Sequence, residues 1–154
     1  MINEMTINEI QDDIIQEFTI SDDWMDKYNQ LIDTGRNLPV IDPGFKTNDY
    51  LIEGCQSKVW LHPEFDGTRI SFTADSDAII TRGIVALLIK VLNDRTPDEI
   101  ISTELYFIDR IGLRQNLSPT RSNGLLSMVR QIKLYAMAYK ATGNRYQAED
   151  KSKK

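Results

Sequence analysis

The segment of this chain best suited to chemistry contains its single cysteine and has the sequence Gly54-Cys55-Gln56-Ser57-Lys58-Val59-Trp60-Leu61. Gly54 allows a sharp turn and the close approach of another molecule. Gln56 and Ser57 suit a turn and supply hydrogen-bond donors. Val59 and Leu61 alternate with polar residues, as in a half-buried strand. We therefore expect a thiol on a loop held by a strand, where it can attack an electrophilic sulfur and carry it as a persulfide.

A lone cysteine has an ordinary explanation as well. Free cysteine is among the most buried residue types and usually behaves as a small hydrophobic side chain. The glycine before Cys55 and the polar pair after it favour a loop instead. With one cysteine in the chain, an intramolecular disulfide and a multi-cysteine zinc site are both excluded.

The segment at Cys55 resembles the signature of the SufE family, the sulfur-accepting partners of cysteine desulfurases. Further segments resemble the family in the same order and spacing. They are Ala74-Asp75-Ser76-Asp77-Ala78, then Gly83 with Ala86-Leu87-Leu88, and Ser118-Pro119-Thr120-Arg121-Ser122-Asn123-Gly124-Leu125 with Met128 after it. Thr120 stands where many members carry serine, so the hydroxyl is retained. The first fifty residues and the tail after Gly143 are less diagnostic.

The resemblance implies a role for Cys55. It would take the terminal sulfur from the persulfide of a pyridoxal-phosphate-dependent cysteine desulfurase of the SufS or CsdA type and so stimulate that enzyme. The sulfur would then pass to an Fe–S assembly scaffold complex. Gly54, Gln56 and Ser57 would support the loop. Pyridoxal phosphate would belong to the desulfurase, so this chain would need no cofactor or metal and would have no independent turnover.

Composition fits a single domain in a reducing compartment. The chain has 154 residues, of which 41% are hydrophobic and 27% charged, and its net charge is −5. A negative net charge without a basic, aromatic-rich stripe argues against a nucleic-acid partner. No apolar run approaches the roughly 18 residues of a membrane span, and the N-terminus lacks the pattern of a signal peptide. We expect a cytoplasmic protein, a monomer or weak dimer, with no membrane or nucleic-acid partner.

The first part of the chain predicts two helices. Thr6 and Glu9 form a plausible capping box, followed by isoleucines at helical spacing up to Phe18. A second helix is expected to begin at Ser21 and to end at Gly35, a typical C-terminal stop. Residues 38–45 contain two prolines and predict an irregular connector.

The next segments predict a small antiparallel sheet. Strands are expected at residues 50–52, 58–62 and 68–73, and Asp66-Gly67 is a hairpin signal. The Cys55 loop would join the first two strands, and His62-Pro63 would end the second. The expected fold class is α+β, a three-stranded antiparallel sheet packed against several helices, as in SufE and the Fe–S scaffold proteins that the family resembles.

Helices are expected to follow the sheet. Residues 78–92 are apolar enough for a central helix. Thr96 begins another with a capping signal. A short helix is expected around residues 104–110, and the last over residues 122–141. Gly143 would end the last helix, which gives a single domain over residues 1–143 and a polar, disordered tail over residues 144–154.

Three charged residues have both a structural and a functional interpretation. Asp75 and Asp77 precede the central helix, where a carboxylate or Ser76 would cap it; the alternative is a docking face for a basic partner. Arg121 would pair with a surface acid, or it would lie beside the Cys55 loop and favour the thiolate.

Two other function classes stay open. Cys55 and His62 could be the nucleophile and base of a hydrolase, but an extended strand would hold them about 20 Å apart. The chain could also be a scaffold for an Fe–S cluster or zinc, which needs three or four ligands. Trp60 is either an exposed docking anchor or a core residue beneath a helix.

Overall fold

A computed structural model gives the fold, and it describes residues 5–152, with side chains up to residue 142. The elements in chain order are α1 (Ile7–Phe18), α2 (Trp24–Arg36), the short 3-10 helices η1 (Pro43–Phe45) and η2 (Asn48–Tyr50), β1 (Val59–Phe65), β2 (Ile70–Ser76), α3 (Ile79–Leu92), α4 (Pro97–Ser102), α5 (Phe107–Arg110), α6 (Leu113–Asn116) and α7 (Pro119–Ser152). The predicted α+β class is confirmed.

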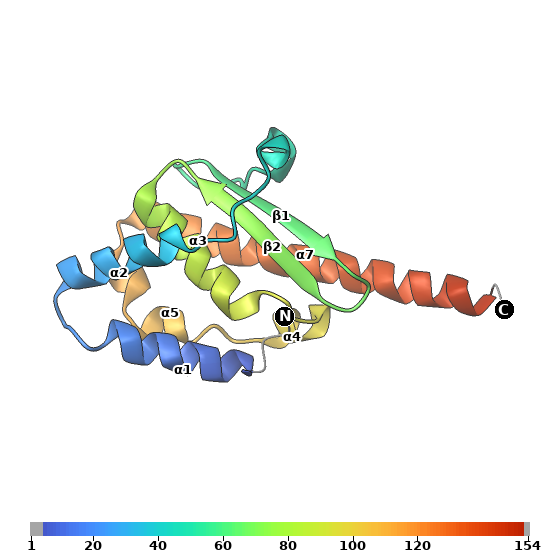
Figure 1. Ribbon diagram of the computed structural model, residues 1–154, viewed down its shortest axis with the longest axis horizontal. Coiled ribbons are helices and arrows are strands. Elements are labelled where there is room, and N and C mark those ends of the chain that lie inside the picture. Colours follow the sequence, from blue (N-terminus) through green and yellow to red (C-terminus); the bar gives the residue numbers. More distant parts are fainter. Residues whose placement is uncertain (1–4, 153–154) are drawn as a thin grey trace.

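Helix α3 is the centre of the molecule, because it packs against α1, α2, α7 and strand β2. In Figure 1 the β1–β2 hairpin lies along one side of α3, with α1 and α2 on other sides, and α7 extends past the end of the hairpin. The apolar run of α3 supplies this shared core; its buried members include Ile84, Leu88 and Leu92. The predicted central helix is therefore confirmed.

The sheet differs from the prediction, because within residues 5–152 it has two strands, β1 and β2, paired antiparallel. The expected third strand is reduced to a single bridge between Leu51 and Trp60. The Val59 carbonyl accepts from the Ile52 N–H on this edge, so the odd-numbered residues of β1 direct their backbone groups towards it. Pairing stops after this bridge because Asn48–Tyr50 form the 3-10 helix η2, so Tyr50 is not extended where it would face Leu61. Strand β1 itself passes His62-Pro63 and ends at Phe65.

Along both strands of the hairpin, buried side chains alternate with more exposed ones, as the sequence predicts. Ile70 and Phe72 are buried against the helices. The opposite face is crossed by the segment over residues 42–50, which we name the strap. Its Phe45 ring stacks on His62 at 3.8 Å between centroids, and its Lys46 ammonium lies 4.7 Å from the centre of the Trp60 ring. Trp60 is thus half-buried beneath the strap rather than beneath a helix.

Several helix ends match the sequence and several do not. The capping boxes at Thr6 and Thr96 form as predicted. Helix α2 is capped by Asp23 and continues past Gly35 to Arg36. Helix α7 begins at Pro119, earlier than expected. It also passes Gly143 and reaches Ser152, since one glycine costs a helix only about 1 kcal/mol.

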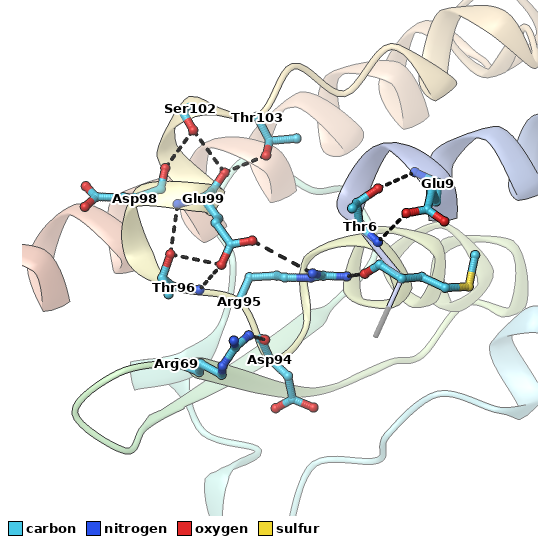
Figure 2. A network of polar contacts seen from close by, with 11 residues as sticks. Thr6, Glu9, Arg69, Asp94, Arg95, Thr96, Asp98, Glu99, Ser102 and Thr103 are labelled. Atoms are coloured by element: carbon cyan, nitrogen blue, oxygen red, sulfur yellow. Dashed lines mark hydrogen bonds and ion pairs between the residues drawn. The ribbon is translucent and has the colours of Figure 1, made fainter. Parts of the chain in front are cut away.

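A buried arginine ties together elements that are far apart in the sequence. The Arg95 side chain donates to the carbonyl of Met5, just before α1, and its guanidinium lies 3.8 Å from the Glu99 carboxylate of α4. Figure 2 shows the Arg95–Glu99 pair. Arg69 donates to the carbonyl of Asp94 at 2.7 Å, which links the hairpin to the end of α3. These contacts fix the hairpin and the N-terminal helix around α3.

Candidate functional site

Cys55 lies on a loop that is tied at both ends. At its start the Ile52 N–H donates to the carbonyl of Val59 at 2.8 Å. At its end the Lys58 N–H donates to Oδ1 of Asp77 at 3.0 Å, and the Lys58 carbonyl accepts from the Asp77 N–H at 3.3 Å. Residues 53–57 form the span between these ties.

Glycine is required beside Cys55 for two reasons. Gly54 has a φ of +91°, a left-handed conformation that other residues rarely adopt. A Cβ at Gly54 would lie 2.4 Å from Oγ of Ser127 on α7. The loop therefore lies directly against α7, and a side chain at position 54 would be strained by the positive φ and would have to displace the Ser127 hydroxyl.

The sulfur of Cys55 is half-buried against the first turns of α7. Its Sγ lies 3.5 Å from the carbonyl oxygen of Gly124, as donor to acceptor. Burial raises the pKa of the Cys55 thiol above its usual value. In this conformation the group is consequently a thiol, not a thiolate, at neutral pH.

A cavity of about 310 Å³ opens beside the sulfur, where the Cys55 loop, α3 and the start of α7 meet. Most of its lining side chains are polar. The lining residues are Cys55, Gln56, Ser57, Thr81, Ile84, Ser118, Thr120, Arg121, Gly124 and Met128. The fold thus joins two segments that are far apart in the chain, the loop and the start of α7, around one thiol.

Arg121 shares this cavity with Cys55. Its backbone N–H donates to Oγ of Ser118 at 3.3 Å. Its side chain is exposed and has neither an ion pair nor a hydrogen bond among the residues that the structure describes. The expected partner acid is thus not present in that part of the chain. The pKa of Cys55 is shifted by burial, so the guanidinium does not produce a thiolate in this conformation.

The two aspartates before α3 do not cap it, which corrects the prediction. The N-cap is Ala78, whose own side chain makes no capping hydrogen bond, and the Ser76 hydroxyl accepts from the Ala78 N–H at 3.2 Å. Asp75 accepts from Nζ of Lys46 at 3.0 Å and pairs with Arg82 at 2.9 Å. Burial raises the pKa of this carboxyl, but the hydrogen bonds and the two cations outweigh burial and leave its pKa lowered. The Asp77 carboxylate is used at the end of the Cys55 loop instead.

His62 lies elsewhere, among aromatic rings of the strap. Besides the Phe45 stack, its ring meets Tyr50 edge-on at 4.8 Å between centroids. It does not line the Cys55 cavity, so the fold does not assemble the cysteine–histidine pair of a hydrolase. Among the residues described, no group of three or more His, Cys, Asp or Glu side chains is placed to hold a metal ion.

Six residues that line the cavity were not predicted as site residues: Thr81, Ile84, Ser118, Thr120, Gly124 and Met128. The last four belong to the segment that resembles the family, whereas Thr81 and Ile84 do not. Thr81 and Ile84 come from α3, which we expected only to fill the core. A signal existed for Thr81, because it begins the i, i+3, i+7 series that continues with Ile84 and Leu88. A hydroxyl at the head of such a series faces inward.

Within the described residues, no helix has the length and apolar character needed to cross a membrane.

Comparison with known proteins agrees with this geometry. The family model described as "SufE: Fe-S metabolism associated domain" matches residues 12–136. The SufE-like protein 1, chloroplastic/mitochondrial, of Arabidopsis thaliana is 42% identical over 118 residues, which cover 76% of this chain and 32% of that protein. An uncharacterized SufE-like protein of Rhizobium meliloti (strain 1021) is 37% identical over 127 residues, covering 79% of this chain and 91% of the relative.

A solved structure shares the fold. The solution structure of a hypothetical protein from Thermus thermophilus has a TM-score of 0.72 with this chain, at 15% identity, and covers 89% of this chain and 99% of its own. The family model spans most of the described fold, including the Cys55 loop and the start of α7. This chain therefore belongs to the SufE family, whose domain is associated with Fe–S metabolism.

Proposed function

We propose that this protein is a sulfur acceptor, which takes persulfide sulfur from a cysteine desulfurase onto Cys55. The observation that supports the proposal most directly is the position of the thiol. It lies on a loop tied at both ends, at the wall of a cavity with room for additional sulfur. The cavity also holds the cation of Arg121, which has no ion pair among the described residues. The SufE-like relatives and the family model support the same role.

The transfer step is a thiol–disulfide exchange. The Cys55 thiolate attacks the terminal sulfur of the enzyme's persulfide, and a new S–S bond forms as the old one breaks. The thiolate of the desulfurase cysteine leaves, and the proton on the terminal sulfur stays with it. No net oxidation occurs, so the step needs no other reactant. Release of its cysteine frees the desulfurase for another turnover, which is how the acceptor would stimulate it.

The attack requires a thiolate, whereas burial favours the thiol. We therefore propose two positions for Cys55: a sheltered one against Gly124, and an extended one in which the sulfur reaches into the partner and ionises more easily. Gly54 allows the backbone change. In the sheltered position the persulfide would be protected from oxidation until it reaches an Fe–S assembly complex.

Cofactor, partner and location follow from this role. Pyridoxal phosphate would be bound by the desulfurase and not by this chain. The desulfurase would be of the SufS or CsdA type, and a reducing compartment such as the cytoplasm would keep Cys55 available.

The test is sulfur transfer between purified proteins. The protein is incubated with a cysteine desulfurase and L-cysteine, and intact mass is measured beside the matched Cys55→Ser variant. We expect one or more added sulfur atoms on the wild-type chain, none on the variant, and faster sulfide release only with the wild type. Full stimulation by a folded Cys55→Ser protein would refute the proposal.

A further inference from the structure

The cavity beside Cys55 contains a hydroxyl without a hydrogen bond among the described residues, that of Thr81. Thr81 is only 7% exposed and lines the cavity from α3. Its hydroxyl has no hydrogen bond with any residue in the part of the chain that the structure describes. The oxygen is not among the fully buried unpartnered polar atoms of these residues, so it is open to the cavity and available to a group held there.

Other threonines of this chain donate their hydroxyl to a nearby backbone carbonyl, and Thr81 has no such bond among the described residues. The hydroxyls of Thr19, Thr34 and Thr103 each donate to the carbonyl four residues earlier, at 2.6, 2.8 and 2.5 Å. For Thr81 that carbonyl would belong to Asp77, which precedes the helix, since the first bond of α3 runs from Arg82 to Ala78. The usual local partner is therefore out of position.

The remaining hydroxyls of the cavity are less protected. Ser118 and Thr120 are exposed, and Ser57 is only partly buried. The Ser118 oxygen also accepts from the N–H of Arg121. A hydrogen bond inside a site shielded from water is electrostatically stronger than one at its rim. Thr81 is thus the hydroxyl best placed to act on a group held inside the cavity.

We infer that Thr81 is a positioning residue for sulfur, whose hydroxyl donates to the terminal sulfur of a persulfide on Cys55 when that sulfur occupies the cavity. This inference rests on the proposed function. The cavity volume of about 310 Å³ is ample for one sulfur, since a water molecule takes about 30 Å³. Of the lining side chains, Cys55 has the only thiol and Arg121 the only guanidinium, so the terminal sulfur would meet one cation and otherwise uncharged groups.

The test loads the persulfide without a desulfurase. Inorganic polysulfide reacts with the Cys55 thiolate, which takes one sulfur while a polysulfide shorter by one sulfur leaves. The pH dependence of alkylation of the terminal sulfur by iodoacetamide is then measured, with the product identified by mass. The proteins compared are wild type, Thr81→Val, which keeps the shape without the hydroxyl, Thr81→Ser, which keeps the hydroxyl, and Thr120→Val as the matched control at the rim.

We expect the profile of loaded Thr81→Val to move up by about one pH unit, because a hydrogen bond to a charged group is lost. Thr81→Ser and Thr120→Val should follow the wild type. Without polysulfide all four profiles should coincide, since Sγ of Cys55 bonds to Gly124 and not to Thr81. Thr81→Ala replaces Thr81→Val if the latter does not fold.

Two results would overturn the inference: a loaded Thr81→Val profile that matches the wild type, or an equal shift in Thr120→Val. Another result would contradict the proposed function without contradicting the role of Thr81. If polysulfide loads the wild-type protein but a desulfurase with L-cysteine does not, the desulfurase is not the donor. The Thr81 comparison would still stand.

Discussion

Two glycines hold Cys55 in position, each in a different way. Gly54 gives the loop its left-handed turn and its close approach to Ser127. Gly124 provides the carbonyl oxygen to which Sγ donates, and a Cβ on this residue would lie 3.5 Å from Sγ, at ordinary contact. The first position tolerates no side chain, whereas the second tolerates a methyl group.

Gly54→Ala is expected to displace the loop and speed alkylation of Cys55, because Ala resists positive φ and its Cβ would meet Ser127. The measurements are the alkylation rate at one pH and the unfolding midpoint. Ser127→Ala serves as the control, and the double variant separates the two causes, since it removes the Oγ clash but not the strained φ. Alkylation at the wild-type rate in Gly54→Ala would show that the loop holds its place without the glycine.

Arg121→Ala is expected to leave the pH dependence of Cys55 alkylation in the free protein unchanged. The pKa of Cys55 is raised by burial, and the exposed guanidinium has little effect on a shielded thiol. The proteins compared are wild type, Arg121→Ala and Arg121→Lys, by iodoacetamide reaction across pH. A profile that moves to higher pH in the alanine variant alone would instead assign the thiolate-favouring role to Arg121.

Part of the site could be predicted from the sequence. Cys55, Gly54 and Arg121 stand out because the segments around them are unusual, and both segments line one cavity. Thr81 could not be identified as a site residue, since its environment depends on how α3 meets α7 and the loop. The sequence shows that Thr81 begins a series of inward-facing residues on α3, but it does not show that a cavity forms beside them.

Among the elements, the tightest contact joins α2 to α3. A Cβ on Gly83 would lie 2.2 Å from the backbone oxygen of Leu31, and one on Gly35 would lie 3.1 Å from the N of Gly83. Gly35 therefore serves helix packing. The prediction that it ends α2 is wrong, because the same residue type suits a helix end and a close crossing.

Gly83→Ala is expected to destabilise the protein by about 1–3 kcal/mol, because the backbone of α2 must move to admit the methyl group. Gly124→Ala is the matched control, since it also lies inside a helix but meets only ordinary contacts. Better helix propensity should make that variant equal to the wild type or more stable by up to about 1 kcal/mol. Denaturant unfolding measures both, and equal midpoints would contradict the tight-crossing account.

The prediction of a third strand was wrong because strand pairing depends on contacts between segments, which a local sequence pattern does not describe. Alternation and turn signals located the β1–β2 hairpin, and the Asp66 carboxylate accepts from the N–H groups of Thr68 and Arg69 as the turn requires. The segment at residues 50–52 has strand-like residues, but Tyr50 belongs to the 3-10 helix η2, so the extended pairing is limited to the bridge at Leu51. Pairing depends on both strands, and a local pattern describes only one.

At the scale of the whole molecule, Asp75 connects three regions. It belongs to β2, and it binds Lys46 of the strap and Arg82 of α3. Its lowered pKa means that the ionised form is favoured in the folded state. The stabilisation is thus present above the pKa of the unfolded chain and is lost as the pH falls through the lower pKa of the folded state.

Asp75→Asn is expected to unfold more easily than the wild type at neutral pH, with a difference that shrinks as the pH falls below about 4 and disappears in stronger acid. Unfolding midpoints across pH measure the effect. Asp33→Asn is the control, because Asp33 pairs with Arg36 on the open surface and should matter little at any pH. A difference that persists undiminished in acid would indicate a role in packing rather than in charge pairing.

The hydrogen bonds at the two ends of the Cys55 loop limit how far Cys55 can move. With Ile52 bound to Val59 and Lys58 bound to Asp77, the Cα of Cys55 is three residues from each anchor. A fully extended chain covers about 3.5 Å per residue, so the Cα stays within roughly 11 Å of both anchors. A donor must therefore bring its sulfur almost to the surface of this protein. A donor that holds its sulfur deeper must break an anchor. For such a donor, the strength of these few hydrogen bonds determines how far Cys55 can move.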